Sequence, residues 1–150
     1  MRVVALDALN AAHIAAARAL CTTGRAAELL ERAISGTPEC RARVAITTDG
    51  GTTGIALHGL VAGALGTAAL LWVGVAPGLR RRGIGRALLA DALGAARDAG
   101  ARLIVAEVAA EPASGPVFAL LRRCGFEREG EIADFYRDGV ALTLWRRSLD

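Results

Sequence analysis

Two kinds of hydrophobic pattern alternate along the chain. Short apolar or alternating runs that end at turn residues predict strands, and apolar residues spaced three or four apart predict helices. The strands are expected at residues 3–6, 43–48, 55–60, 68–75, 102–108, 127–135 and 141–146, and the helices at 8–20, 25–34, 87–96 and 117–123. This order, β-α-α-β-β-β-α-β-α-β-β, predicts a mixed α/β fold around one sheet, and 150 residues suit a single domain over 1–150.

A stretch without charge allows a second interpretation. No charged residue occurs between Gly50 and Leu79, and the apolar part, residues 55–76, has the length of a membrane-spanning helix. Five glycines between residues 54 and 74, together with His58, are typical of strands joined by turns instead. We therefore predict a hairpin, in which His58 is a strand residue with a satisfied hydrogen bond, and no membrane partner.

Composition restricts the chemistry. All 18 basic residues are arginine, so a Schiff-base lysine and the lysine of a Walker-type phosphate loop are both excluded. The net charge of +3 fits an anionic ligand without indicating nucleic acid. Three separated cysteines and two histidines predict neither a disulfide framework nor a metal site. Charged residues interrupt the apolar N-terminal segment, so no signal peptide is predicted and the cytoplasm is expected.

Residues 80–86 read R-R-R-G-I-G-R between a predicted strand and a predicted helix. Four arginines at a helix N-terminus lie at the positive end of the helix dipole and repel one another. An anionic partner is needed to reduce this repulsion. Gly83 and Gly85 permit close backbone approach, and the nearby N–H groups can bind phosphate oxygens. The segment predicts a pyrophosphate site. The alternative is a solvated arginine run that serves solubility or nonspecific nucleic-acid contact. The six aromatic residues of the whole chain do not favour nucleic-acid binding.

With these residues, the chain resembles the GNAT superfamily of N-acetyltransferases. The family's acetyl-CoA motif, [RQ]-x-x-G-x-[GA], matches residues 80–85, and V-G-V-A-P at 73–77 resembles its fourth strand. The resemblance implies a mostly antiparallel sheet with helices on both faces, splayed at strands 4 and 5. It also implies acetyl-CoA as co-substrate, and the cofactor-binding residues expected are Val73, Gly74, Val75, Arg80, Arg81, Arg82, Gly83, Ile84, Gly85, Arg86 and Ser114.

The chain departs from the family pattern at two positions. Ser114 stands where the family often has asparagine, and Leu121 stands where it often has the tyrosine that protonates the CoA thiolate. A non-catalytic CoA-binding module is therefore the alternative function. Tyr136, the single tyrosine, is the candidate for the acid or for the acceptor side of the cleft, with plain packing as the other interpretation.

Glu107 is the candidate general base for an amine acceptor. It is the one charge in L-I-V-A-E-V-A, where we expect a central strand with a buried or half-buried carboxylate. The alternative is a strand-end glutamate paired with an arginine. A free backbone N–H at a bulge near Val75 is expected to polarise the thioester carbonyl. The sequence thus predicts acetyl transfer to a primary amine of a small molecule or protein, with the oligomeric state open, a homodimer included.

Overall fold

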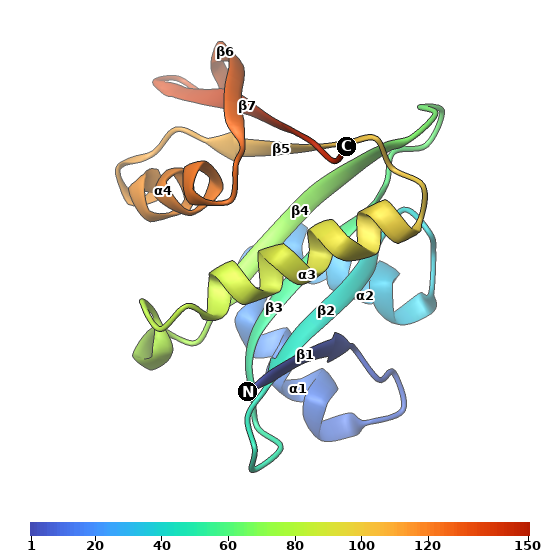
Figure 1. Ribbon diagram of the computed structural model, residues 1–150. Coiled ribbons are helices and arrows are strands. Elements are labelled where there is room, and N and C mark those ends of the chain that lie inside the picture. Colours follow the sequence, from blue (N-terminus) through green and yellow to red (C-terminus); the bar gives the residue numbers. More distant parts are fainter.

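A computed structural model describes residues 1–150, and its seven strands form one sheet in the order β1-β2-β3-β4-β5-β7-β6 (Figure 1). The strands are β1 (Arg2–Ala5), β2 (Arg41–Ile46), β3 (Thr52–Leu60), β4 (Thr67–Val75), β5 (Leu103–Ala109), β6 (Glu127–Arg137) and β7 (Val140–Ser148). The helices are α1 (Ala11–Leu20), α2 (Gly24–Ser35), α3 (Ile84–Asp98) and α4 (Gly115–Arg123), with short 3₁₀ turns η1 (Pro77–Leu79) and η2 (Pro112–Ser114). The predicted order of elements is confirmed.

The helices cover both faces of the sheet, as predicted. α1 and α2 lie behind β2 and β3 in Figure 1, where Leu30, Val44 and Leu57 belong to one buried cluster. α3 and α4 lie in front, and a second cluster there contains Leu89 and Trp145. Each large apolar side chain so buried contributes roughly 1.5–3 kcal/mol to folding. The sheet therefore supports two cores, and α3 crosses its front face.

The charge-free segment forms two strands. β3 and β4 pair in antiparallel fashion from Gly54–Val75 to Leu60–Ala68. Helices cover β3 on both faces, which explains why consecutive and mostly apolar residues along it, 53–59, are buried. The alternative of one helix over residues 55–76 is wrong, and no helix of the structure has the length and apolar character needed to span a membrane.

β4 and β5 run parallel and then separate. Their ladder begins at Thr67–Leu103 and ends at Leu70–Ala106, although β4 continues to Val75 and β5 to Ala109. This confirms the predicted splay at strands 4 and 5. The bulge in β4 is at Leu71, where the register with β3 shifts, so its expected place near Val75 is wrong. A bulge bends and twists its strand, and this one follows directly on the last residue of β4 that pairs with β5.

Candidate functional site

The arginine-rich loop leads from the splay into α3. Gly83 is the N-cap of α3 at φ +79°, and Arg81 also has a positive φ, +63°. Glycine adopts this region readily, whereas a residue with a Cβ is strained there by roughly 1–2 kcal/mol. No side chain caps the helix, so the N–H groups of its first turn are free to bind an acceptor. The loop thus holds its backbone in a strained, ligand-accessible form.

The arginines of this loop have almost no partners. Arg80, Arg81, Arg82 and Arg86 are all exposed. Arg80 Nε donates to the backbone oxygen of Val75 at 3.3 Å, and the other three make no hydrogen bond or ion pair. Four like charges therefore lie around an uncapped helix N-terminus, and no acidic side chain pairs with them. A phosphate-bearing group fits this arrangement.

The three β4 residues predicted to bind the cofactor present their backbone to the splay. A Cβ at Gly74 would lie 2.8 Å from the Leu20 backbone oxygen, so glycine is needed for the close approach of α1. Val73 and Val75 pack against the apolar cluster beneath α3. The valine side chains therefore pack in the core. That the main chain of these residues contacts a cofactor stays a prediction.

Ser114 supports the connection between β5 and α4. Its hydroxyl donates to the Ala109 oxygen at 2.5 Å and accepts from the Glu111 N–H at 3.1 Å, and the residue is buried. These bonds hold η2 in front of α4. A contact between Ser114 and the cofactor therefore also stays a prediction.

Glu107 lies in the open part of the splay. It is one residue past Ala106, the last residue of β5 that pairs with β4, and its neighbour on the other side is Leu144 of β7. The expectation of burial is wrong: Glu107 is exposed, because β4 has turned away at this level. No ion pair involves it, so the alternative of an arginine-paired glutamate is not seen.

Tyr136 comes to the same region from β6. Burial raises the pKa of the phenol, the nearby Glu107 carboxylate raises it further, and Arg25 at the start of α2 lowers it. The ring is 45% exposed and lies edge-on to Phe135, with centroids 5.0 Å apart. The fold thus brings together the two residues predicted to be catalytic, with Arg25 as a third charged or polar neighbour that the sequence did not indicate.

The position of Tyr136 depends on an irregular stretch of β6. Ile132 pairs with Leu142 and Arg137 with Val140, so residues 133–136 bulge out of the ladder. Asp134 has φ +54°, and its Oδ1 accepts the N–H of Gly139 at 2.7 Å. Arg137 forms an ion pair with Glu111, which follows β5. These contacts tether the tip of the β6–β7 hairpin to the end of β5.

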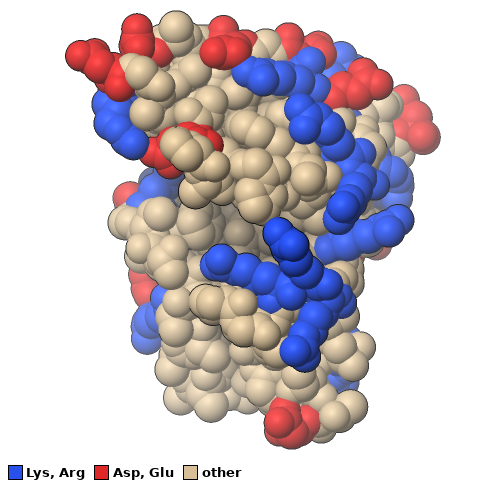
Figure 2. All heavy atoms as spheres, turned by 90° about the vertical axis from the view of Figure 1, so that its left-hand side faces the viewer, with Lys and Arg blue, Asp and Glu red and all other residues tan.

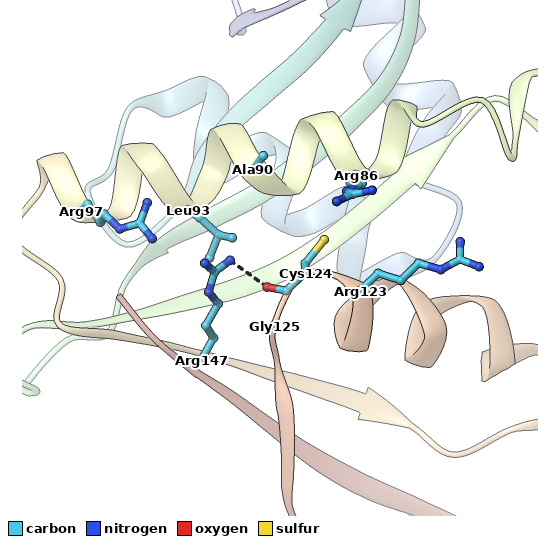
Figure 3. Close-up of a pocket in the computed structure, with 8 residues that line it drawn as sticks. All are labelled: Arg86, Ala90, Leu93, Arg97, Arg123, Cys124, Gly125 and Arg147. Atoms are coloured by element: carbon cyan, nitrogen blue, oxygen red, sulfur yellow. Dashed lines mark hydrogen bonds between the residues drawn. The ribbon is translucent and has the colours of Figure 1, made fainter. Parts of the chain in front are cut away.

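A basic pocket of about 420 Å³ lies between α3, the C-terminal end of α4 and β7 (Figure 3). Arg147 Nη1 donates to the Cys124 oxygen at 2.7 Å, and Arg97 Nε donates to the Leu149 oxygen at 2.9 Å. Arg86 and Arg123 lie toward the same end of the pocket and have no such partner. No acidic residue lines it. Arg97, Arg123 and Arg147 were not predicted as site residues, although the helical spacing of positions 86, 90, 93 and 97 indicates a common face of α3.

The arginines of the loop and of the basic pocket lie mostly on one side of the molecule. Figure 2 shows basic side chains below and to the right of a central hollow, with acidic side chains mainly along the upper edge. The view faces the side on which α4, η1 and the N-terminal end of α3 lie in Figure 1. An anionic ligand is therefore attracted to this side of the splay.

None of the three cysteines is suited to nucleophilic chemistry. Cys21, Cys40 and Cys124 are all buried, and burial raises the pKa of each thiol, to about 11 for Cys21. A thiol with a raised pKa forms little thiolate at neutral pH. Acyl transfer through a cysteine is therefore not supported, and Cys124 packs in the core.

His58 differs from its prediction. It is a buried strand residue, but its Nε2 has no hydrogen-bond partner. Burial lowers the pKa of the imidazole to about 4, and the charges of Arg43 and Arg41 lower it while Asp91 raises it. The residues of α3 that line the cavity beside His58 are Ala95, Ala96 and Asp98, and none of them bonds to Nε2.

We expect His58 to make folding sensitive to acid. Between pH 6.5, its ordinary pKa, and about 4, the unfolded chain binds a proton at this residue that the folded chain does not. The free energy of unfolding should therefore fall by about 3 kcal/mol as the pH is lowered through this range. Denaturant titrations at several pH values should show that His58→Leu loses this part of the pH dependence and that His13→Leu keeps it. Identical slopes for His58→Leu and the wild type would contradict the prediction.

Comparison with known proteins agrees with the fold. Residues 36–126 match the model of the acetyltransferase (GNAT) family, so the chain belongs to the GNAT family of acetyltransferases. A search of curated protein sequences found no significant match.

Three solved structures illustrate the similarity. A protein from Desulfovibrio desulfuricans assigned to the GNAT family is 26% identical, with 99% of each chain covered and a TM-score of 0.85. An aminoglycoside 6′-N-acetyltransferase in complex with coenzyme A is 14% identical, with 100% of this chain and 98% of that one covered and a TM-score of 0.83. The ribosomal-protein-S18-alanine N-acetyltransferase of Escherichia coli is 17% identical, with 99% and 94% covered and a TM-score of 0.78. The last two share the fold.

Proposed function

We propose that residues 1–150 act as one domain that transfers an acetyl group from acetyl-CoA to a primary amine of a small molecule or protein. The observation that carries this proposal is the opening between β4 and β5. The unpaired arginines of residues 80–86 lie at its α3 side, and Glu107 and Tyr136 lie on its β5 and β6 side. A site for a phosphate-bearing cofactor and a site for proton transfer thus share one opening.

The arginine loop suits the pyrophosphate of the co-substrate. Arg81, Arg82 and Arg86 are without partners, and the first-turn N–H groups of α3 are uncapped. In this proposal they hold phosphate oxygens, while the main chain of Val73–Val75 pairs with the pantetheine arm. Arg86 and Arg123, the free cations of the basic pocket, are placed to attract the nucleotide end. That a similar fold was solved with coenzyme A supports this assignment.

The acceptor side provides a base and an acid for the transfer. Acetyl-CoA supplies an activated thioester. Glu107 accepts a proton from the ammonium form of the acceptor, directly or through water, so that the neutral nitrogen can react. The nitrogen bonds to the thioester carbonyl carbon, the C–S bond breaks, and Tyr136 donates its phenolic proton to the leaving sulfur, in place of the tyrosine lacking at Leu121. The second proton lost by the nitrogen returns to the phenolate. An unpaired carboxylate beside a phenol that stays protonated at neutral pH supports this division of roles.

Binding of CoA tests the cofactor part of the proposal. Arg81→Ala and Arg86→Ala each remove a charge-assisted contact worth roughly 1.5–3 kcal/mol, so the Kd for CoA should rise about 10- to 150-fold. Arg2→Ala is the matched control, because Arg2 is an exposed arginine of β1 without an ion pair. Calorimetry with CoA and with phosphate-free pantetheine separates the contributions. Unchanged CoA affinity in both variants at low salt would contradict the phosphate assignment.

Turnover distinguishes the enzyme from a non-catalytic CoA-binding module. We expect thiol release from acetyl-CoA when the wild-type protein is given a panel of primary amines that includes aminoglycosides, polyamines and peptides with free α-amino groups. Acceptor-dependent release supports transfer and identifies the acceptor class. Tight CoA binding without release across the panel supports the binding module.

A further inference from the structure

A second cavity lies beneath the C-terminal half of α3, away from the arginine loop. It has a volume of about 570 Å³, within the range of small-molecule pockets, and Ala95 and Ala96 of α3 and Ala99, which follows the helix, face it. Leu6 after β1 and Leu60 of β3 add to its mostly apolar lining. The small side chains of α3 leave this space open between the helix and the sheet.

The cavity contains a buried polar atom that the protein does not satisfy. His58 is 3% exposed and lines the cavity, and its Nε2 has no hydrogen-bond partner. Nearly all buried polar groups in proteins are paired with protein atoms, water or a ligand. The unpaired nitrogen therefore indicates that something else occupies the space in front of it.

Of the two arginines near His58, one is paired with an acidic residue and the other is not. Arg43 is paired with Asp91 through its Nε and through an Nη2–Oδ1 contact of 3.1 Å. Arg41 is the cross-strand neighbour of His58 and also lines the cavity, but no ion pair involves it. Asp98 also lines the cavity, at the exposed C-terminal end of α3, but its charge is not among those that act on His58. A positive charge without a partner thus lies beside the buried imidazole.

We propose that this cavity is a second ligand site, which binds a small carboxylate with an apolar body. His58 Nε2–H and the Arg41 guanidinium donate to the carboxylate, and the apolar body lies against the alanines and leucines of the lining. A neutral imidazole can donate from Nε2 when its other nitrogen is unprotonated. The 15 residues of α3 separate this site by about 20 Å from the arginine loop, so the proposal is independent of acetyl transfer.

Hexanoate is the probe, with hexylamine as its counterpart of opposite charge. The chain has two histidines, so the ring signals of His58 and His13 are readily distinguished by NMR. At pH 7 we expect hexanoate to shift the His58 ring signals in a saturable manner and to leave those of His13 in place. The added negative charge should also raise the pKa of His58 from its free value, which a pH titration of the complex measures directly.

Two variants examine the contacts. Calorimetry, which does not need the His58 signal, should show that Arg41→Gln and His58→Phe each weaken hexanoate binding by about tenfold or more, while Arg2→Gln, at the start of β1, does not. Circular dichroism checks that each variant is folded, and if one is not, the wild-type titration still decides. No His58 shift with hexanoate, or an equal shift with hexylamine, would overturn the proposal and leave water as the partner of Nε2. The titration contains no CoA, so its outcome does not depend on whether the acetyltransferase proposal holds.

Discussion

Tyr136→Phe is expected to lower kcat by roughly 10²- to 10⁴-fold, while the KM for acetyl-CoA stays nearly constant. The substitution removes the phenolic proton and keeps the ring that lies edge-on to Phe135. Burial and the Glu107 carboxylate raise the pKa of Tyr136 above its ordinary value of 10, so the phenol keeps its proton at neutral pH and is available as an acid. Steady-state kinetics with the acceptor identified from the amine panel measure the effect.

The pH profile separates an acid from a packing residue. Wild-type kcat should decline on the alkaline side, above pH 10, where Tyr136 loses its proton, and Tyr136→Phe should lack this limb. Phe135→Leu is the control for packing, because it alters the neighbouring ring and leaves the phenol in place. Equal rates and identical profiles for the wild type and Tyr136→Phe would assign Tyr136 to the acceptor wall and water to thiolate protonation.

Glu107→Gln should cause a loss of activity of similar size, but at neutral pH and not on the alkaline side of the pH profile. Glutamine has nearly the same shape but accepts no proton, so kcat/KM at neutral pH should fall roughly 10²- to 10⁴-fold. The loss should diminish as the pH approaches the pKa of the acceptor amine, about 10, because the free amine then forms without a base. CoA affinity should be unchanged, since Glu107 lies across the splay from the arginine loop.

A matched glutamate variant makes this test specific. Glu39 is exposed and has no ion pair, so Glu39→Gln changes the net charge equally at a position before β2. It should keep the wild-type rate at every pH. A Glu107→Gln enzyme with full activity at neutral pH would exclude Glu107 as the base and leave proton removal to a water chain. Parallel loss at all pH values would indicate a positioning role instead.

The local properties of the chain determined most of the fold. Alternating and apolar runs set the strands, alanine-rich helical spacing set the helices, and the glycines of the charge-free segment set a hairpin in place of a single helix. These predictions succeed because they depend on neighbours in sequence. The loop of residues 80–86 was predictable for the same reason, since its arginines, its glycines and the helix that follows are contiguous.

Tertiary structure alone decided the features that depend on distant segments. Glu107 is exposed because β4 turns away at the Leu71 bulge, 36 residues earlier in the chain, which a pattern of apolar residues around the glutamate cannot reveal. Tyr136 reaches Glu107 through the bulge in β6 and the Arg137–Glu111 ion pair. Arg123 joins Arg86 only where α4 packs beside α3, and His58 lacks a partner because no side chain that the fold brings to its cavity bonds to Nε2. Side-chain environment is set by packing between elements, whereas local sequence sets the elements themselves.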